Sequence, residues 1–537
     1  MTSLLSIDNL KIAYGDDNWA VDEVSFQLEK GEVRALVGES GSGKSTIGKS
    51  ILRLLPSKST ITGDICFQGE SILSYTPSQL RKFRGEAVGL VFQDPMTRLN
   101  PLMTIGNHCL ETLQTHQPNL TFQEAKRKVL TTLEMVKIAT DRFEQYPHEF
   151  SGGMRQRVAI ALALLLEPKL IIADEPTTSL DVTISRQILA EFTYLCREKN
   201  VSLLLISHDL AMVATYSDYL SVMYQGKIVE TGLTKEIISA PHHSYTKQLF
   251  NSSLAFNPPS PQVLNSLKNS NPEIILEIRN LHKTYSLEPN IFQRMLGKKS
   301  KLIKAVDDIN LQIYQGEIIG LVGESGCGKS TLSRTILQLI KATEGQVNFQ
   351  GKNLVTLKKN SLKSVRRQLQ MIFQDPQASL NPMMTVLNIL SEPLIIHKLG
   401  DKKEIRSKVI KMLNKVGLTP FEDYINRYPK QLSGGQQQRV AVARALITNP
   451  QLIICDEAVS MLDATIQSQV LELMLNLKEE FNLTYLFITH DLAVARYFCN
   501  RIAVMNQGKI VELAPTTEIF NNPQHPYTQS LLSGWNY

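Results

Sequence analysis

Short apolar runs alternate along this 537-residue chain with longer segments in which hydrophobic residues recur at helical spacing. The strand-like runs cover residues 4–10, 33–37, 63–69, 88–92, 170–173 and 202–207, and later 274–281, 345–351, 369–373, 452–455 and 485–489. The helix-period segments include residues 122–136 and 403–416. Because unbroken apolar strands that alternate with helices are typical of a parallel sheet covered on both faces, the predicted fold class is α/β.

One pattern of runs and motifs is present twice in the chain. Lys44 and Lys329, which occupy equivalent positions, are 285 residues apart (329 − 44). Later pairs repeat at 281 or 282 positions: Gln93 with Gln374, Ser151 with Ser433, Asp174 with Asp456, and His208 with His490. Such a period indicates a duplicated domain. We therefore expect domains at residues 1–250 and 274–537, joined by a flexible linker at 251–273 that is rich in Asn, Ser and Pro.

Composition and charge narrow the class of protein. With 43% hydrophobic and 20% charged residues the chain is typical of soluble globular proteins, and a net charge of +6 does not indicate direct nucleic acid binding. No apolar run approaches the roughly 18 residues that cross a bilayer, and the first residues do not resemble a secretory signal. None of the six cysteines lies in a CxxC pair, so free thiols in the cytoplasm are expected.

A glycine-rich segment at residues 38–46, GESGSGKST, follows a predicted strand and begins a predicted helix that ends near Pro56. This context indicates a phosphate-binding loop, in which backbone amides surround an anion, a lysine reaches the β- and γ-phosphates and a hydroxyl binds Mg²⁺. The second copy, residues 323–331, has Cys327 where the first has Ser42, and an amide-lined loop tolerates either side chain. The predicted ATP-binding residues are Ser40, Gly41, Ser42, Gly43, Lys44, Ser45 and Thr46, and Ser325, Gly326, Cys327, Gly328, Lys329, Ser330 and Thr331.

Two carboxylates follow an apolar strand in each copy, at the edge where α/β sheets bind their ligands. We predict that Asp174 holds Mg²⁺ together with Ser45, and Asp456 with Ser330. The second carboxylates, Glu175 and Glu457, are predicted to polarise the water that attacks the γ-phosphate. Taken alone, such a run is more often a capped strand end, but its equal spacing from both loops favours the catalytic interpretation.

Serine followed by two glycines begins a further predicted helix in each copy, and presents backbone amides that suit an anion. These residues are Ser151, Gly152 and Gly153, and Ser433, Gly434 and Gly435. Each segment precedes its aspartate by 23 positions (174 − 151; 456 − 433), and here the sequence resembles the ATP-binding-cassette (ABC) family over both halves. The resemblance implies two tandem P-loop NTPase domains, each with a mostly parallel core sheet, a β subdomain and a helical subdomain.

The resemblance implies several further roles. Tyr14 and Tyr285 would stack on adenine, Gln93 and Gln374 would sense Mg²⁺ and the membrane partner, and His208 and His490 would contact the γ-phosphate. Asp181 and Asp463 match the family's D-loop. A lone tyrosine after a strand is otherwise more often a packing residue, and a lone histidine there is more often a buried structural one.

In the family the two domains pair head to tail, so that each phosphate loop is completed by the serine–glycine segment of the other copy. ATP binding would then close the pair. Because every principal catalytic position is filled in both copies, we expect two competent sites.

The sequence around the shared core resembles the peptide and nickel importer subfamily, in a form that fuses two ATPases. The segments that carry this resemblance are residues 92–101, 146–154, 243–246, 373–382 and 525–528. The resemblance implies two transmembrane permease subunits, an extracytoplasmic substrate-binding protein and a peripheral location at the cytoplasmic face of the inner (plasma) membrane. A soluble double-cassette ATPase acting on ribosomes or nucleic acid is the alternative, which the short linker disfavours. Dipeptide, oligopeptide, glutathione, microcin-like peptide and nickel cargo all remain open.

Overall fold

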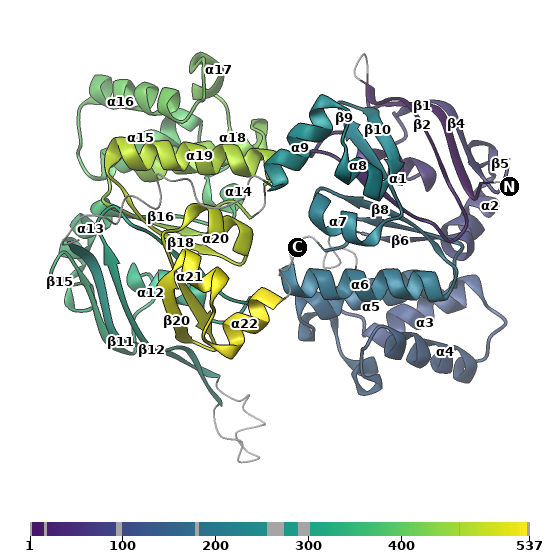
Figure 1. The fold of residues 1–537 in the computed structure, drawn as a ribbon, viewed down its shortest axis with the longest axis horizontal. Helices are drawn as coiled ribbons and strands as arrows, with labels where there is room; N and C mark the ends of the chain where they lie inside the picture. The colour runs from purple at the N-terminus through teal and green to yellow at the C-terminus, as the bar shows by residue number, and fades with distance from the viewer. Residues whose placement is uncertain are drawn as a thin grey trace. The chain divides into compact units, whose positions relative to one another are not determined.

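Two compact units make up the chain in the computed structural model (Figure 1). The structure describes residues 3–15, 19–92, 99–177, 182–254, 273–287, 301–460 and 462–533. The first unit ends at Leu254 and the second holds most of the remaining residues. They are called unit 1 and unit 2, and each is described by itself.

The core of unit 1 is a six-stranded sheet in the order β10-β9-β3-β8-β7-β6. Its strands are parallel except for the antiparallel β9–β10 pair, and all five residues of β3 are buried. The α/β class expected from the unbroken apolar runs is therefore confirmed. The bounds are β3 Val33–Val37, β6 Val88–Val91, β7 Leu170–Asp174, β8 Ser202–Ser207, β9 Tyr219–Tyr224 and β10 Lys227–Leu233.

A second, antiparallel sheet in unit 1 has the order β2-β1-β4-β5. Buried and exposed residues alternate along most of β2, as in a sheet with one face on the core. That face packs together with Ile47 and Ile51 of α1 and with apolar residues of the six-stranded sheet, so α1 contributes to the core between the two sheets. The bounds are β1 Leu5–Ala13, β2 Trp19–Leu28, β4 Thr60–Phe67 and β5 Glu70–Ser71.

Helices α3 to α9 of unit 1 pack on the opposite face of the central sheet and include the expected helical part. Helix α1 ends at Ile51 rather than near Pro56, which corrects the sequence prediction. Arg53 adopts a left-handed conformation with φ 50°, and the Arg53 and Leu54 amides donate to the carbonyls of Ser50 and Lys49, which closes the helix as in a Schellman motif. The bounds are α1 Lys44–Ile51, α2 Pro77–Lys82, α3 Ile105–His116, α4 Phe122–Met135, α5 Gly152–Leu164, α6 Val182–Glu198, α7 Leu210–Tyr216, α8 Thr234–Ser239 and α9 Ser244–Leu254.

Unit 2 repeats both sheets in the orders β16-β17-β18-β13-β19-β20 and β12-β11-β14-β15. The predicted end of β11 at residue 281 is wrong, because the strand continues to Leu287 and Tyr285 pairs with Ile303 of β12. The bounds are β11 Ile274–Leu287, β12 Lys301–Tyr314, β13 Ile318–Val322, β14 Glu344–Phe349, β15 Lys352–Asn353, β16 Leu369–Ile372, β17 Leu452–Asp456, β18 Thr484–Thr489, β19 Arg501–Asn506 and β20 Lys509–Pro515.

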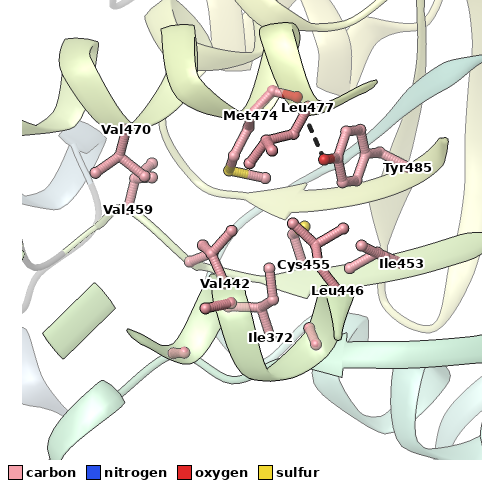
Figure 2. Packing of buried hydrophobic residues seen from close by; sticks show 14 of the residues in the cluster. Ile372, Val442, Leu446, Ile453, Cys455, Val459, Val470, Met474, Leu477 and Tyr485 are labelled. Atoms are coloured by element: carbon pink, nitrogen blue, oxygen red, sulfur yellow. Dashed lines mark hydrogen bonds between the residues drawn. The ribbon is translucent and has the colours of Figure 1, made fainter. Parts of the chain in front are cut away.

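Helices α18 and α19 pack on the central sheet of unit 2 through a dense apolar core (Figure 2). In this core the hydroxyl of Tyr485 on β18 donates to the carbonyl of Met474 on α19 at 3.3 Å, so the buried phenol has an acceptor. The bounds are α12 Lys329–Ile336, α13 Lys359–Gln368, α14 Pro376–Ser379, α15 Val386–Ile396, α16 Lys402–Lys415, α17 Glu422–Ile425, α18 Gly434–Leu446, α19 Ala464–Phe481, α20 Leu492–Phe498, α21 Thr516–Asn521 and α22 Pro526–Ser533.

The segment predicted as a linker, residues 251–273, begins as helix, because α9 continues to Leu254. Its residues 255–272 lie outside the described part of the chain. Among the described helices of both units, none has the length and hydrophobicity that a membrane span requires.

Candidate functional sites

The predicted phosphate loop of unit 1 lies between β3 and α1. The Nζ of Lys44 donates to the carbonyls of Gly38 and Glu39, each at 2.7 Å, and the amide of Ser42 donates to the Glu39 carbonyl at 3.2 Å. Burial lowers the pKa of Lys44, although the neighbouring carboxylate of Glu175 opposes this shift. The loop is thus shaped by its own hydrogen bonds, with a lysine folded over it at a helix N-terminus.

Unit 2 has the same loop between β13 and α12. The Nζ of Lys329 donates to the carbonyls of Gly323 at 2.6 Å and Glu324 at 2.9 Å. The Sγ of Cys327 is buried and lies 3.9 Å from Nζ, in the place of the Ser42 hydroxyl of unit 1, which is 3.4 Å from Lys44. The exchange of serine for cysteine leaves the backbone geometry of the loop unchanged.

The first carboxylate at the end of each core strand faces the hydroxyl that follows the loop lysine. Ser45 donates to Asp174 at 2.8 Å, and Ser330 donates to Asp456 at 3.1 Å. Burial raises the pKa of both aspartates, and the adjacent glutamate adds to the shift in each case. A nearby cation would offset the free-energy cost of burying these carboxylates in their charged form.

These oxygen pairs fit Mg²⁺. Carboxylate and hydroxyl oxygens are its preferred protein ligands, and it usually binds through one or two such groups together with substrate phosphates and water. The described residues contain no group of three or more His, Cys, Asp or Glu side chains that could hold a metal ion. The predicted ligand Gln374 lies instead against Glu457, and the other, Gln93, lies outside the described residues.

The second carboxylate of unit 1, Glu175, is held in a fixed orientation. Its backbone has φ 48°, its amide donates to the Ile206 carbonyl at 2.9 Å, and its carboxylate contacts His208 Nδ1 at 3.1 Å. Burial alone would lower the pKa of His208, but the hydrogen bond to Glu175 and the charges of Glu175 and other carboxylates such as Asp209 together outweigh burial, and the pKa is raised. The two side chains therefore form a charge-coupled pair at the ends of β7 and β8.

Unit 2 repeats this pair, and here the glutamate also contacts a glutamine. Glu457 has φ 51°, its carboxylate lies 3.3 Å from His490 Nδ1, and it accepts a hydrogen bond from Gln374 Nε2 at 2.7 Å. Burial alone would raise the pKa of Glu457, but the hydrogen bond to His490 and the positive charges of His490 and Lys329 together outweigh burial, and the pKa is lowered. An ionised carboxylate of this kind can accept a proton from water.

The two tyrosines predicted at the adenine differ in setting. Tyr14 follows β1, is 47% exposed, and its hydroxyl lies 3.0 Å from that of Thr46 on α1, which places it beside the phosphate loop. Tyr285 lies within β11, is 38% exposed, and its ring centroid is 5.0 Å from Lys283 Nζ. Both rings are accessible for stacking.

The serine–glycine segments begin helices, as predicted. Ser151 caps α5 and accepts from the amide of Met154 at 3.4 Å, while a Cβ on Gly153 would lie 2.9 Å from Ile184 of α6. Ser433 caps α18 in the same way, and a Cβ on Gly435 would lie 2.7 Å from Ile466 of α19. The second glycine is therefore needed where these helices cross.

The two copies differ at the fourth residue of this segment. In unit 2, the Oε1 of Gln436 accepts a hydrogen bond from the Ser433 amide at 3.0 Å and completes a capping box. In unit 1 the equivalent residue, Met154, offers no such acceptor. Of the two predicted D-loop residues, Asp463 directly precedes α19, and Asp181 lies outside the described residues.

A contact that sequence reasoning missed joins the C-terminal part of each unit to its phosphate loop. The hydroxyl of Tyr245 accepts from the amide of Glu39 at 3.1 Å, and that of Tyr527 accepts from the amide of Glu324 at 3.2 Å. The sequence did contain a signal for this contact, because the two tyrosines are 282 positions apart (527 − 245). This is the same offset as between Asp174 and Asp456 and between His208 and His490.

A groove of about 260 Å³ in unit 1 is lined in part by Phe92, the residue before Gln93. Its walls come from the end of α1, from β6, α3 and α5, and include Leu52, Leu54, Arg84, Leu90, His116 and Leu162. Leu102 and Met383, which follow the equivalent Asn-Pro pairs of the two copies, are 85% and 84% exposed. The two copies thus expose a large apolar side chain at the same position.

Comparison with known families gives two matches in each half of the chain. A model described as "ABC transporter" matches residues 21–178 and 306–460. A model described as "Oligopeptide/dipeptide transporter, C-terminal region" matches residues 229–280 and 511–535. The second pair of matches includes both tyrosines that contact the phosphate loops.

Similar proteins extend over nearly the whole chain. The chain is 40% identical to a glutathione import ATP-binding protein of Escherichia coli (strain K12) and 38% identical to one of Pectobacterium atrosepticum, in each case over 99% of this chain and 89% of the relative. Among solved structures, a dimeric ATP-binding cassette in a post-hydrolysis state with ADP and phosphate is 34% identical over 45% of this chain and 98% of that chain, with a TM-score of 0.40.

Proposed function

Because the chain belongs to the ABC transporter family, as an importer-type ATP-binding protein, we propose that its two units hydrolyse MgATP to drive import of a peptide or peptide-like solute such as glutathione. The observation that carries this proposal is the pairing, in both halves, of a complete Lys-Ser-Asp-Glu-His constellation with an oligopeptide-type C-terminal region. The same C-terminal matches favour an importer over a ribosome-associated ATPase.

Lys44 and Lys329 are proposed to exchange their loop carbonyls for the β- and γ-phosphate oxygens of ATP. Ser45 with Asp174, and Ser330 with Asp456, would hold Mg²⁺. When bound, Mg²⁺ neutralises charge on the phosphates during transfer. The raised pKa of the buried aspartates, which disfavours their charged form, supports a role beside a cation.

Glu175 and Glu457 are proposed as the general bases that take a proton from the attacking water. His208 and His490 contact these carboxylates, and are proposed to contact the γ-phosphate as well. The remaining predicted residues keep what the resemblance implies: Tyr14 and Tyr285 would stack on adenine, and Gln93 and Gln374 would sense Mg²⁺ and the membrane partner. Asp181 and Asp463 would belong to the D-loops.

We further propose that each site is completed by the other copy, with Ser433 and Gly435 closing the loop of Lys44, and Ser151 and Gly153 closing that of Lys329. A trapping experiment in a chain carrying both Glu→Gln changes tests this pairing. Adding Lys44→Ala and Ser433→Arg together should leave one trapped ATP per chain, because both changes disable the site of Lys44 and leave the site of Lys329 intact. If Lys44→Ala with Ser151→Arg retained more ATP than that pair, the proposed pairing would be wrong.

The permeases are proposed to dock along the groove that Phe92 helps to line, and beside the exposed Leu102 and Met383. This would place the protein peripherally at the cytoplasmic face of the membrane, with a substrate-binding protein supplying cargo from the other side. Mutating an exposed docking residue, as in Met383→Asp, should release the subunit from the complex without lowering its own ATPase rate.

The decisive experiment purifies the complex from membranes in detergent, reconstitutes it in liposomes and measures phosphate release with its binding protein. Reduced glutathione, a dipeptide, an oligopeptide and Ni²⁺ are added separately. We expect stimulation by a peptide-like solute, and none in the matched complex carrying Glu175→Gln and Glu457→Gln. Sedimentation with ribosomes and failure to recover any permease subunit would refute the importer function.

A further inference from the structure

The second residue of each phosphate loop is held from outside the loop. In unit 1 the carbonyl of Glu39 accepts hydrogen bonds from Lys44 Nζ and from the amide of Ser42, so this one residue organises the loop. Its amide donates to the hydroxyl of Tyr245, which lies 206 positions later in the chain. The orientation of the Gly38–Glu39 peptide therefore depends on a side chain of the C-terminal region.

Unit 2 contains the same arrangement with different surroundings. The Glu324 carbonyl accepts from Lys329 Nζ at 2.9 Å and from the Cys327 amide at 3.3 Å, while the Glu324 amide donates to Tyr527. The ring of Tyr245 stacks on Tyr224 with centroids 4.1 Å apart, whereas Asn506 occupies the position of Tyr224 in unit 2. The tyrosine–loop contact is thus kept in both units although the stacking partner of the ring is not, which indicates that the contact does not depend on that stacking.

A histidine and a glutamate anchor each tyrosine. The amide of Tyr245 donates to Nδ1 of His243 at 3.2 Å, and the amides of His242 and His243 donate to the carboxylate of Glu230 at 2.8 and 3.1 Å. Although burial opposes it, these amide bonds lower the pKa of Glu230, so the carboxylate remains charged and holds the turn.

The equivalent anchor in unit 2 consists of His525 and Glu512. The amide of Tyr527 donates to Nδ1 of His525 at 3.1 Å, and the amides of Gln524 and His525 donate to Glu512 at 2.9 and 3.0 Å. Glu230 and Glu512 both lie beside a shift of register in the hairpin that ends the central sheet. Such bulges re-aim side chains, here toward the turn before the last helix.

We propose that Tyr245 and Tyr527 are positioning residues that fix the second peptide of each phosphate loop, so that the C-terminal segment of each unit sets the nucleotide affinity of that loop. Neither tyrosine takes part in hydrolysis. Burial keeps Tyr245 neutral by raising its pKa to about 12, which suits a fixed hydrogen-bond acceptor. Since coupling between sites is reciprocal, nucleotide bound at the loop should in turn stabilise α9 and α22.

The inference rests on ATP binding at these loops, as proposed above, and its test separates the two ideas. In full-length chain carrying Lys329→Ala, so that only the loop of unit 1 binds, Tyr245→Phe removes the hydroxyl and keeps the ring. A fluorescent ATP analogue should bind about fivefold more weakly, as expected for one lost hydrogen bond, and the Michaelis constant should rise while kcat is kept. Tyr224→Phe is the matched control, because it removes a hydroxyl from the stacked ring that makes no bond to the loop.

Hydrogen exchange provides the second measurement and needs no nucleotide. In the nucleotide-free chain, Tyr245→Phe should speed exchange of the Glu39 amide, and on addition of ADP the protection of α9 seen in the parent should be lost. Equal exchange and equal affinity in parent and Tyr245→Phe chains would overturn the inference, as would the same shift in Tyr224→Phe. Tyr527→Phe in a Lys44→Ala chain tests unit 2 in the same way.

Discussion

Two glycines of the first phosphate loop allow a sharp test of why the loop needs glycine. Gly41 and Gly43 both have left-handed backbones, with φ 82° and 102°. A Cβ on Gly41 would meet nothing within 4 Å, whereas a Cβ on Gly43 would lie 2.3 Å from the carbonyl oxygen of Ala20. Substitution by alanine at the two positions therefore separates conformational strain from lack of space.

The expected magnitudes follow from these two terms. A left-handed alanine costs about 1–2 kcal/mol, which both variants incur. Forcing a methyl group into filled space adds about 1–3 kcal/mol for Gly43→Ala alone, so its free energy of unfolding should fall by about 2–5 kcal/mol in total. For a domain of about 150–250 residues each kcal/mol lowers the Tm by about 2–4 °C.

The assay is differential scanning calorimetry of the nucleotide-free chain, with titration of a fluorescent ATP analogue as a second readout. Gly41→Ala should lower the Tm of unit 1 by about 2–8 °C, and Gly43→Ala should lower it by several degrees more and abolish nucleotide binding at that loop. Equal losses of Tm in the two variants would refute the view that the Ala20 carbonyl leaves no room. Gly328→Ala provides an independent repeat in unit 2, since its Cβ would lie 2.1 Å from the Ala305 carbonyl oxygen.

Three further predictions concern the catalytic pairs and the helix caps. Glu175→Gln with Glu457→Gln should lower kcat by at least about 100-fold while ATP remains bound, and an unchanged rate of phosphate release would exclude the two glutamates as bases. His490→Ala leaves burial as the main influence on Glu457, so the Glu457 pKa rises and the acidic limb of the kcat–pH profile moves to higher pH; an unmoved limb would contradict this pairing. Met154→Gln should complete the capping box at Ser151 and raise the free energy of unfolding by about 0.3–1.5 kcal/mol, and calorimetry that shows no gain would contradict the cap assignment.

The core strands and their motifs could be predicted from the sequence because continuous apolar runs and glycine spacing are local signals. The predicted runs 202–207 and 170–173 agree with β8 and β7 to within one residue. The end of α1 could not be predicted, because its terminating turn places Arg53, rather than glycine, in the left-handed position. The length of β11 could not be predicted either, since it depends on pairing with β12 and not on the composition of β11 itself.

Within the site, the sequence predicted which residue types would meet but not every partner. The closeness of Ser45 and Asp174 could be predicted, because a hydroxyl and a carboxylate that bind the same Mg²⁺ must lie side by side. The bond from Gln374 to Glu457, and those from the loop amides to the tyrosines, join segments far apart in the chain by a single polar contact. Such contacts leave no periodic trace in the sequence, although the shared 282-residue offset of the tyrosines could have drawn attention to them.

The lysines folded over the two loops have a thermodynamic consequence. Lys44 and Lys329 are already hydrogen-bonded to loop carbonyls, so the binding of phosphate exchanges one set of oxygen acceptors for another. No segment of the loop has to fold, and little apolar surface is buried there. The heat capacity change that calorimetry measures on nucleotide binding should therefore be small compared with that of coupled folding, and the affinity is not reduced by the entropy of ordering a disordered loop.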